Sequence, residues 1–309
     1  LSIVICALGG GLLEVLVSPI VEALPSEHHE SAMSLLHSFY CWGQVATVLL
    51  STLFLFLLGE NLWMLLPLLW VLVPFLNLFR FRKVPMITPA PDEKMMSVKE
   101  LLSRRLFLTA LLLMLCSGAS ELTMSQWSSL FAEQGLHLPK VLGDVMGPCL
   151  FAVFMGIGRT LYGVFGQKIN LRLSLLGCGA LCTLCYLTTV FAPWPFLSLF
   201  GCAFCGFSVS LMWPGTFSLS AAAFPKGGSA MFGMLAVFGD MGASLGPWIA
   251  GIVSDTAESM PQAFPAFPSG GSAMKYGILA AVIFPMLMIV GALFFRSFRK
   301  GSPSENLNT

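Results

Sequence analysis

A carboxyl group lies near the middle of the first apolar run of the chain. Glu14 lies near the middle of residues 1–24, and Gly10, Gly11 and Ser18 share its helical face, where small side chains leave room for a substrate or a neighbouring helix. Burying a carboxyl in hydrocarbon costs several kcal/mol unless it is protonated, paired or open to water. A cost of this size indicates a function, and we predict that Glu14 binds a proton. The alternative is a protonated carboxyl that only bonds across a helix interface.

Two further carboxyls interrupt later apolar runs. Glu121 shares a helical face with a stripe of small residues: Ser117, Gly118, Ser125 and Ser128. Asp240 is followed one helical turn later by Ser244. We predict that Glu121 contributes to a substrate site. The alternatives are that Glu121 reaches interfacial water near the outer end of its helix, and that Asp240 makes a contact between helices.

Hydrogen-bonding side chains also follow each other at helical spacing in the second apolar run. His37, Tyr40 and Gln44 form one stripe, which suits a ligand rich in hydroxyl groups. Tryptophan rings can stack on the apolar face of a sugar, so Trp127 and Trp213 join the predicted substrate site. Packing between helices, or a position facing lipid, is the alternative for each tryptophan.

The sequence gives little indication of a metal site or of enzymatic activity. Three thiols share one helical face at Cys178, Cys182 and Cys185, but no His, Asp or Glu accompanies them, so they are interpreted as small packing residues. The sequence contains no nucleotide-binding loop, zinc-protease motif or Ser/His/Asp set at motif spacing. We therefore predict no metal, no cofactor and no enzymatic activity.

The elements that must position these residues are membrane-spanning helices. Hydrophobic residues make up 56% of the 309 and charged residues 10%, whereas a soluble domain carries about 25% charged residues. Mean hydropathy is +0.84, so lipid must be the solvent for most of the surface. A helix needs roughly 20 apolar residues to cross a bilayer. Nine runs meet this length: 1–24, 32–58, 61–79, 106–131, 142–166, 172–192, 195–221, 229–253 and 273–295.

The charge distribution predicts the topology. Basic residues gather in the Pro-containing segment 80–105, which is interpreted as a cytoplasmic linker, and in the tail after residue 295, which falls on the same side. The loops at 192–195 and 255–271 then lie outside, and a tight turn at residues 59–61 joins the second and third spans. The basic residues form no field that would bind nucleic acid.

The spans divide unequally around the linker. Residues 1–79 hold three spans and residues 106–309 hold six, and the chain begins at Leu1 rather than at Met. A six-plus-six architecture whose first three helices precede Leu1 accounts for both observations. We therefore expect residues 1–79 to be the remainder of one helical bundle and residues 106–309 to be a complete second bundle.

Short runs of residues resemble those of a known family. The segments 11–14, 18–21 and 35–39 with Gly43 resemble the fourth and fifth helices of fucose permease-like transporters in the major facilitator superfamily. The later residues that are similar to its seventh, tenth and eleventh helices are Gly118, Glu121, Trp127, Trp213, Pro214, Gly239, Gly242, Gly246 and Pro247. The segment from Gly158 and Arg159 through Gly166, Lys168 and Arg172 looks like the superfamily's Gly/Arg-rich cytoplasmic loop between the eighth and ninth helices.

The resemblance implies an all-α, twelve-helix membrane bundle and a set of roles. By it, Glu14 matches an acidic residue used in proton coupling and sugar binding, and His37 and Tyr40 fall where the family places polar ligands for the sugar. The sequence departs from the family at Ser18, where an Asn is usual, and at His37, where fucose permeases carry Gln.

These observations predict a monomeric, proton-coupled symporter for a sugar or similar small polar solute in the plasma or inner membrane. It would work by alternating access of two bundles around a midplane site. The predicted substrate-binding residues are Glu14, His37, Tyr40, Glu121, Trp127 and Trp213, with Glu14 also coupling the proton. The alternatives are a transporter or exporter of another metabolite or drug, and a non-transporting scaffold, sensor or degenerate fragment.

Overall fold

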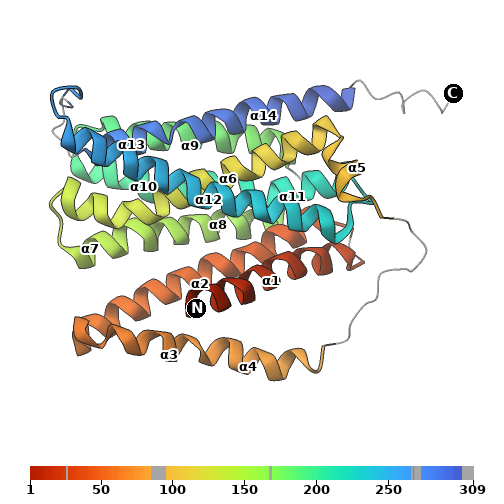
Figure 1. Cartoon of the computed structure of the whole chain (residues 1–309), viewed down its shortest axis with the longest axis horizontal. Helices are drawn as coiled ribbons and strands as arrows, with labels where there is room; N and C mark the ends of the chain where they lie inside the picture. The colour runs from red at the N-terminus through yellow and green to blue at the C-terminus, as the bar shows by residue number, and fades with distance from the viewer. Residues whose placement is uncertain (26, 85–94, 167–168, 266, 268–272, 301–309) are drawn as a thin grey trace.

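The structure is a computed structural model of an all-helical chain (Figure 1). It describes residues 1–25, 27–84, 95–166, 169–265, 267 and 273–300, with side chains to residue 295. Within these residues there is no strand, and nine helices are long and apolar enough to cross a membrane. In hydrocarbon a backbone must satisfy its own hydrogen bonds, and helices do so within one segment. The nine predicted spans are thus confirmed for the described part of the chain.

The first three spans are α1 (Ser2–Ala23), α2 (His29–Leu58) and a third span, Glu60–Phe81, that is built from several short helices. Gly59 ends α2 with φ +90°, a conformation that favours glycine, so the tight turn predicted there is confirmed. The third span consists of η1 (Glu60–Leu65), α3 (Leu66–Trp70) and α4 (Leu72–Phe81). The sequence predicted one continuous helix for this span, and the structure interrupts it.

The remaining six spans follow a short helix, α5 (Val98–Leu102). They are built from α6 (Arg105–Leu130) with η2 (Phe131–Gly135), α7 (Lys140–Asp144) with η3 (Val145–Cys149) and α8 (Leu150–Phe165), α9 (Leu171–Phe191), α10 (Pro195–Val209) with α11 (Met212–Ala223), α12 (Gly228–Ser259), and α13 (Met274–Ala280) with α14 (Ile283–Lys300). Several segments discussed above lie partly outside the described residues: 85–94 of the linker, Lys168, residues 266 and 268–272 of the outer loop, and the tail from 301.

The break between α10 and α11 has a clear cause in the sequence. Residue 214 is proline, which has no backbone N–H, so the carbonyl of Ser210 loses the donor that a continuous helix would supply from residue 214. The helix turns at Ser210 and Leu211 and resumes at Met212. The Ser210 carbonyl, in the middle of a membrane span, therefore needs a hydrogen-bond donor from outside its own helix.

The buried core lies among the helices that follow the linker. In the most apolar window of Arg105–Gly135, 67% of residues are buried inside the protein, whereas none is buried in that of Glu60–Phe81. In Figure 1, α3 and α4 run along the edge of the molecule, and α1 and α2 lie between them and the remaining helices. The end of the molecule where α4 ends and α5 begins is called the linker end below; it lies to the right in Figure 1.

The closest helix packing in the core joins α6 to α12, and glycines permit it. A Cβ added at Gly242 would lie 1.9 Å from the carbonyl oxygen of Leu115, and one added at Gly118 would lie 2.1 Å from that of Gly239. Backbones in contact at this distance leave no space for a side chain. The close contact between α12 and α6, the helix that carries Glu121, therefore depends on glycine in both helices.

Candidate functional site

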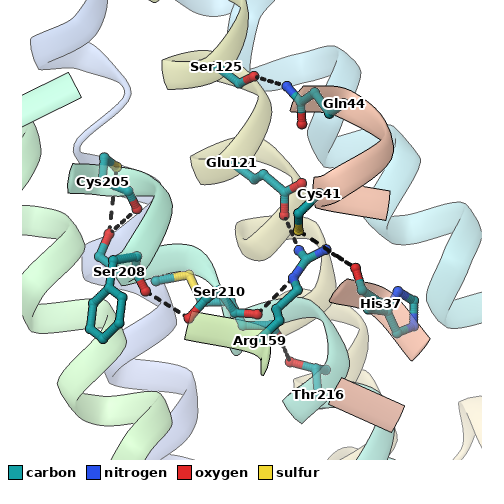
Figure 2. A network of polar contacts seen from close by, with 12 residues as sticks. His37, Cys41, Gln44, Glu121, Ser125, Arg159, Cys205, Ser208, Ser210 and Thr216 are labelled. Atoms are coloured by element: carbon teal, nitrogen blue, oxygen red, sulfur yellow. Dashed lines mark hydrogen bonds and ion pairs between the residues drawn. The ribbon is translucent and has the colours of Figure 1, made fainter. Parts of the chain in front are cut away.

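A buried ion pair lies between α6 and α8. Nη2 of Arg159 donates to Oε2 of Glu121 at 2.9 Å, and their side chains are 2% and 5% exposed (Figure 2). Each charge offsets the desolvation cost of the other. Without its partner, either charge would be too costly to bury inside the protein. Because Glu121 is enclosed and paired, the alternative that it reaches interfacial water is wrong.

Arg159 also ties α8 to two other helices. Its Nε donates to the carbonyl oxygen of Ser210 at 3.0 Å, which is the carbonyl that Pro214 leaves free. Its Nη1 donates to the carbonyl oxygen of His37 in α2 at 3.1 Å. A single guanidinium thus binds α2, α6 and the break between α10 and α11, and its fixed fork of donors suits this task.

Sequence reasoning missed this arginine as a site residue. The resemblance placed Arg159 in a cytoplasmic loop, but α8 continues to Phe165 and buries Arg159. That assignment is wrong for Arg159, because the apolar residues on both sides of it extend the helix. The signal that would have found it is a basic residue six positions before the end of an apolar span, where a charge is expensive and needs a partner.

The polar stripe of α2 faces the ion pair. The Tyr40 ring lies 5.9 Å from Cζ of Arg159, and Tyr40 is 53% exposed. The His37 ring stacks on Phe217 of α11 with 5.7 Å between ring centroids, and its Nε2 lies 3.5 Å from Oγ of Ser18. Tyr40 is therefore open to a ligand, whereas His37 is engaged by its neighbours.

The last member of the α2 stripe also reaches the other helices. Nε2 of Gln44 donates to Oγ of Ser125 in α6 at 3.1 Å, as Figure 2 shows. The serine face of α6 that accompanies Glu121 thus receives a hydrogen bond from α2. Together with Arg159, this bond joins the first helices of the chain to those after the linker.

The carboxyls of α1 and α12 complete the polar surroundings. Glu14 is partly exposed on α1, which packs along α2 and α12. The carboxyls that interact electrostatically with Glu14 are Asp240 and Glu121, and the Tyr40 hydroxyl interacts with Glu14 and Glu121. Asp240 is exposed, so it is not enclosed in a contact between helices. Glu14, Tyr40 and Asp240 therefore lie near enough to one another for electrostatic interaction, and Tyr40 also contacts Arg159 of the buried pair.

The two predicted tryptophans are engaged in packing. Nε1 of Trp127 donates to the carbonyl oxygen of Pro247 at 3.1 Å, which joins α6 to α12. Trp213 is 7% exposed, and a Cβ added at Gly239 would lie 2.3 Å from its ring. Both rings take part in helix contacts in this conformation, with Trp213 almost completely buried and Trp127 partly exposed.

Two buried thiols, those of Cys182 and Cys205, meet between α9 and α10. The sulfurs of Cys182 and Cys205 are 3.7 Å apart, and both residues are buried. Among the residues that the structure describes, no three His, Cys, Asp or Glu side chains are grouped to hold a metal ion.

Comparison with known proteins identifies the class of protein that this helical bundle defines. The family model of the Major Facilitator Superfamily matches residues 1–247, and the chain belongs to this family of membrane transporters. It is therefore a multi-pass membrane transporter rather than an enzyme.

Two solved structures share its fold. One is the transporter FucP in the outward conformation, with a TM-score of 0.70, 17% sequence identity, and coverage of 94% of this chain and 74% of that one. The other is a single-residue variant of the Escherichia coli fucose:proton symporter FucP, with a TM-score of 0.69, 18% identity and the same coverage of 94% and 74%. No curated protein matches the sequence.

Proposed function

We propose that this transporter is a proton-coupled symporter for a sugar or similar small polar solute. The observation that carries the proposal is the partly exposed carboxyl of Glu14, which lies within a membrane span and interacts with Asp240 and the Tyr40 hydroxyl. Ionisable groups inside membrane spans are expensive and often mark proton pathways, so Glu14 is the natural carrier of a coupled proton. The fold shared with a fucose:proton symporter supports the same reading.

The proposal gives each residue a distinct role. Glu14 carries the coupling proton and, with Tyr40, binds hydroxyl groups of the solute. Glu121 stays paired with Arg159 and positions the floor of the site, because its oxygen already accepts an Arg159 hydrogen bond. His37, Trp127 and Trp213 do not bind the solute in this proposal. Their contacts hold in place the helices that carry the site.

Alternating access would move two bundles against each other around this site. We propose residues 1–79 as one bundle, 106–309 as the other and 80–105 as a cytoplasmic linker, in a monomer of the plasma or inner membrane. Hydrogen bonds between α2 and the second bundle join Gln44 to Ser125, the His37 carbonyl to Arg159, and Glu30 to Tyr162. Rocking of the bundles has to break such bonds at one end while others form.

Sugar-driven proton uptake in proteoliposomes tests the proposal. Reconstituted protein is expected to acidify the vesicle interior when a transported sugar is added outside, and Glu14→Gln is expected to abolish this coupling because an amide does not take up the proton. Glu60→Gln is the matched control, since Glu60 lies exposed in the turn after α2. Coupling that survives Glu14→Gln would remove the assigned role.

A thermal-shift screen identifies the solute class. A ligand that binds the folded protein raises its unfolding temperature, so sugars and polyols are expected to stabilise it more than amino acids or hydrophobic drugs. Stabilisation by another metabolite or drug would keep the fold but change the substrate. An absence of both binding and flux would favour a non-transporting scaffold or sensor.

A further inference from the structure

The side-chain amide of Gln44 is bound to the protein at one end only. Its Nε2 donates to Oγ of Ser125 at 3.1 Å, and Ser125 is itself 7% exposed. In Figure 2 the amide oxygen points away from this serine. Among the residues that the structure describes, none donates a hydrogen bond to that oxygen, and the Gln44 side chain is only half-buried. The amide therefore keeps an acceptor and a second N–H for a ligand.

Tyr40 offers a second hydrogen-bonding group one helical turn away on α2. Residues four positions apart share a helical face, with about 5–6 Å between their Cβ atoms. Tyr40 is exposed, and within the described part of the chain its hydroxyl makes no hydrogen bond. The Tyr40 ring lies against Arg159, as the Gln44 amide lies against Ser125. Two groups with spare hydrogen-bonding capacity are thus held next to each other on one helix.

The spare capacity of these groups indicates contact with water or with a solute. A polar group inside a membrane span is costly unless it is hydrogen-bonded. Ser125 follows Glu121 by one helical turn on α6, so the Gln44 amide reaches the face of α6 that carries the buried ion pair. The amide therefore lies beside the candidate site described above.

We propose that Gln44 determines the specificity of the transporter by binding one hydroxyl group of the solute, while Tyr40 binds another. A hydroxyl group donates and accepts, and it therefore suits an amide that offers both functions, whereas a carboxylate lacks the donor and an ammonium group lacks the acceptor. Because the two side chains lie one turn apart, the solute must carry hydroxyl groups at well-separated positions, as a hexose ring does. Ser125 acts as a positioning residue that fixes the amide. This inference rests on the proposed transport of a sugar-like solute.

Binding of monodeoxy sugars tests the role of Gln44. Unfolding temperatures measured over a range of sugar concentrations give the Kd of L-fucose, D-glucose, D-galactose and their monodeoxy forms for the full chain. For the hexose that binds most tightly, at least one deoxy form is expected to bind roughly tenfold more weakly than the parent sugar, because the amide is left without its partner. Gln44→Leu is expected to bind this pair of sugars with equal, weakened affinity. Ser125→Ala should weaken the binding of both and keep the preference for the parent sugar.

The same substitution at another glutamine is the control. Gln126 is exposed on α6, so Gln126→Leu is expected to leave every Kd unchanged. A merely structural role of Gln44 would weaken the binding of all sugars alike. A Gln44→Leu protein that retains every preference of the unchanged protein would therefore overturn the inference and leave the sugar proposal intact. If no hexose binds the unchanged protein, the proposed function and the inference fail together.

Cysteine labelling gives a measurement that does not require Gln44→Leu to fold. In protein reconstituted into liposomes, Gln44→Cys is expected to react with a charged, water-soluble thiosulfonate, and the hexose that binds most tightly is expected to slow this reaction. Mass spectrometry separates the new cysteine from the native ones. Leu49→Cys, at an exposed apolar position on the same helix, is the control whose reaction the hexose should not change. No reaction at residue 44, or a reaction that the hexose does not slow, would contradict a solute contact at Gln44.

Discussion

At the scale of single residues, the charge of Arg159 is fully engaged. It binds one carboxylate and two backbone carbonyls, and its side chain is almost inaccessible. Among the residues that the structure describes, no ion pair involves Glu14 or Asp240, and both are more exposed than Glu121. The buried pair therefore holds helices together, and the proposed proton exchange falls to the more accessible carboxyls.

Removal of the Arg159 charge without that of Glu121 should lower the stability of the folded protein. Arg159→Met leaves Glu121 buried without a partner, and we expect a loss of about 3–5 kcal/mol in stability. The double variant with Glu121→Gln removes both charges and should recover much of that loss. Thermal unfolding in detergent measures both, with Arg105→Met at the exposed start of α6 as the control. A double variant as unstable as the single one would mean that the pair is not the reason for the cost.

At the scale of elements, α6 and α12 are packed tightly against each other. Glycines on both helices bring the backbones into contact, and Trp127 adds a hydrogen bond to the carbonyl of Pro247. The element formed by α10 and α11 is different, because Pro214 breaks it and Arg159 binds the carbonyl that is released. Glu121 thus belongs to the tightly packed helix pair, and Arg159 binds the break between α10 and α11.

The glycine contact predicts an asymmetric response to alanine. Gly242→Ala places a methyl group against the Leu115 carbonyl, so the helices must separate, at a cost of about 1–3 kcal/mol. Gly9→Ala is the matched control, because nothing lies within 4 Å of an added Cβ at Gly9. That control should gain up to about 1 kcal/mol from helix propensity. Equal unfolding temperatures for the two variants would argue against the close contact of α6 and α12.

At the scale of the whole molecule, α2 joins the helices before the linker to those after it. Near the linker end, the Tyr162 hydroxyl donates to Oε2 of Glu30 at 3.1 Å, and Oγ of Ser34 donates to the Arg159 carbonyl at 2.8 Å. Further from that end, Gln44 binds Ser125. The bonds of Tyr162 and Ser34 hold the two parts together at the linker end in this conformation.

Loss of the bond at the linker end should favour opening there. Tyr162→Phe removes a hydrogen bond worth about 1 kcal/mol, so backbone amide exchange at the linker ends of α2 and α8 should rise roughly fivefold. Hydrogen exchange read by mass spectrometry measures this change. Ser125→Ala removes one bond nearer the opposite end and should leave exchange at the linker end unchanged. A rise caused equally by both variants would indicate general loosening rather than a local latch.

The amino-acid sequence by itself determined the nine spans, the turn at Gly59 and the polar positions at Glu14, Tyr40 and Glu121. It could do so because the bilayer acts on each segment separately, and hydropathy and helical spacing are local properties.

Only the tertiary structure decided which of these groups meet. Glu121 and Arg159 are 38 positions apart, and the carbonyl of Ser210 lies a further 51 positions along the chain. Their contact depends on how helices distant in sequence pack, which no local pattern records. The same packing turned Trp127 and Trp213 into helix contacts and left Tyr40 and Asp240 open.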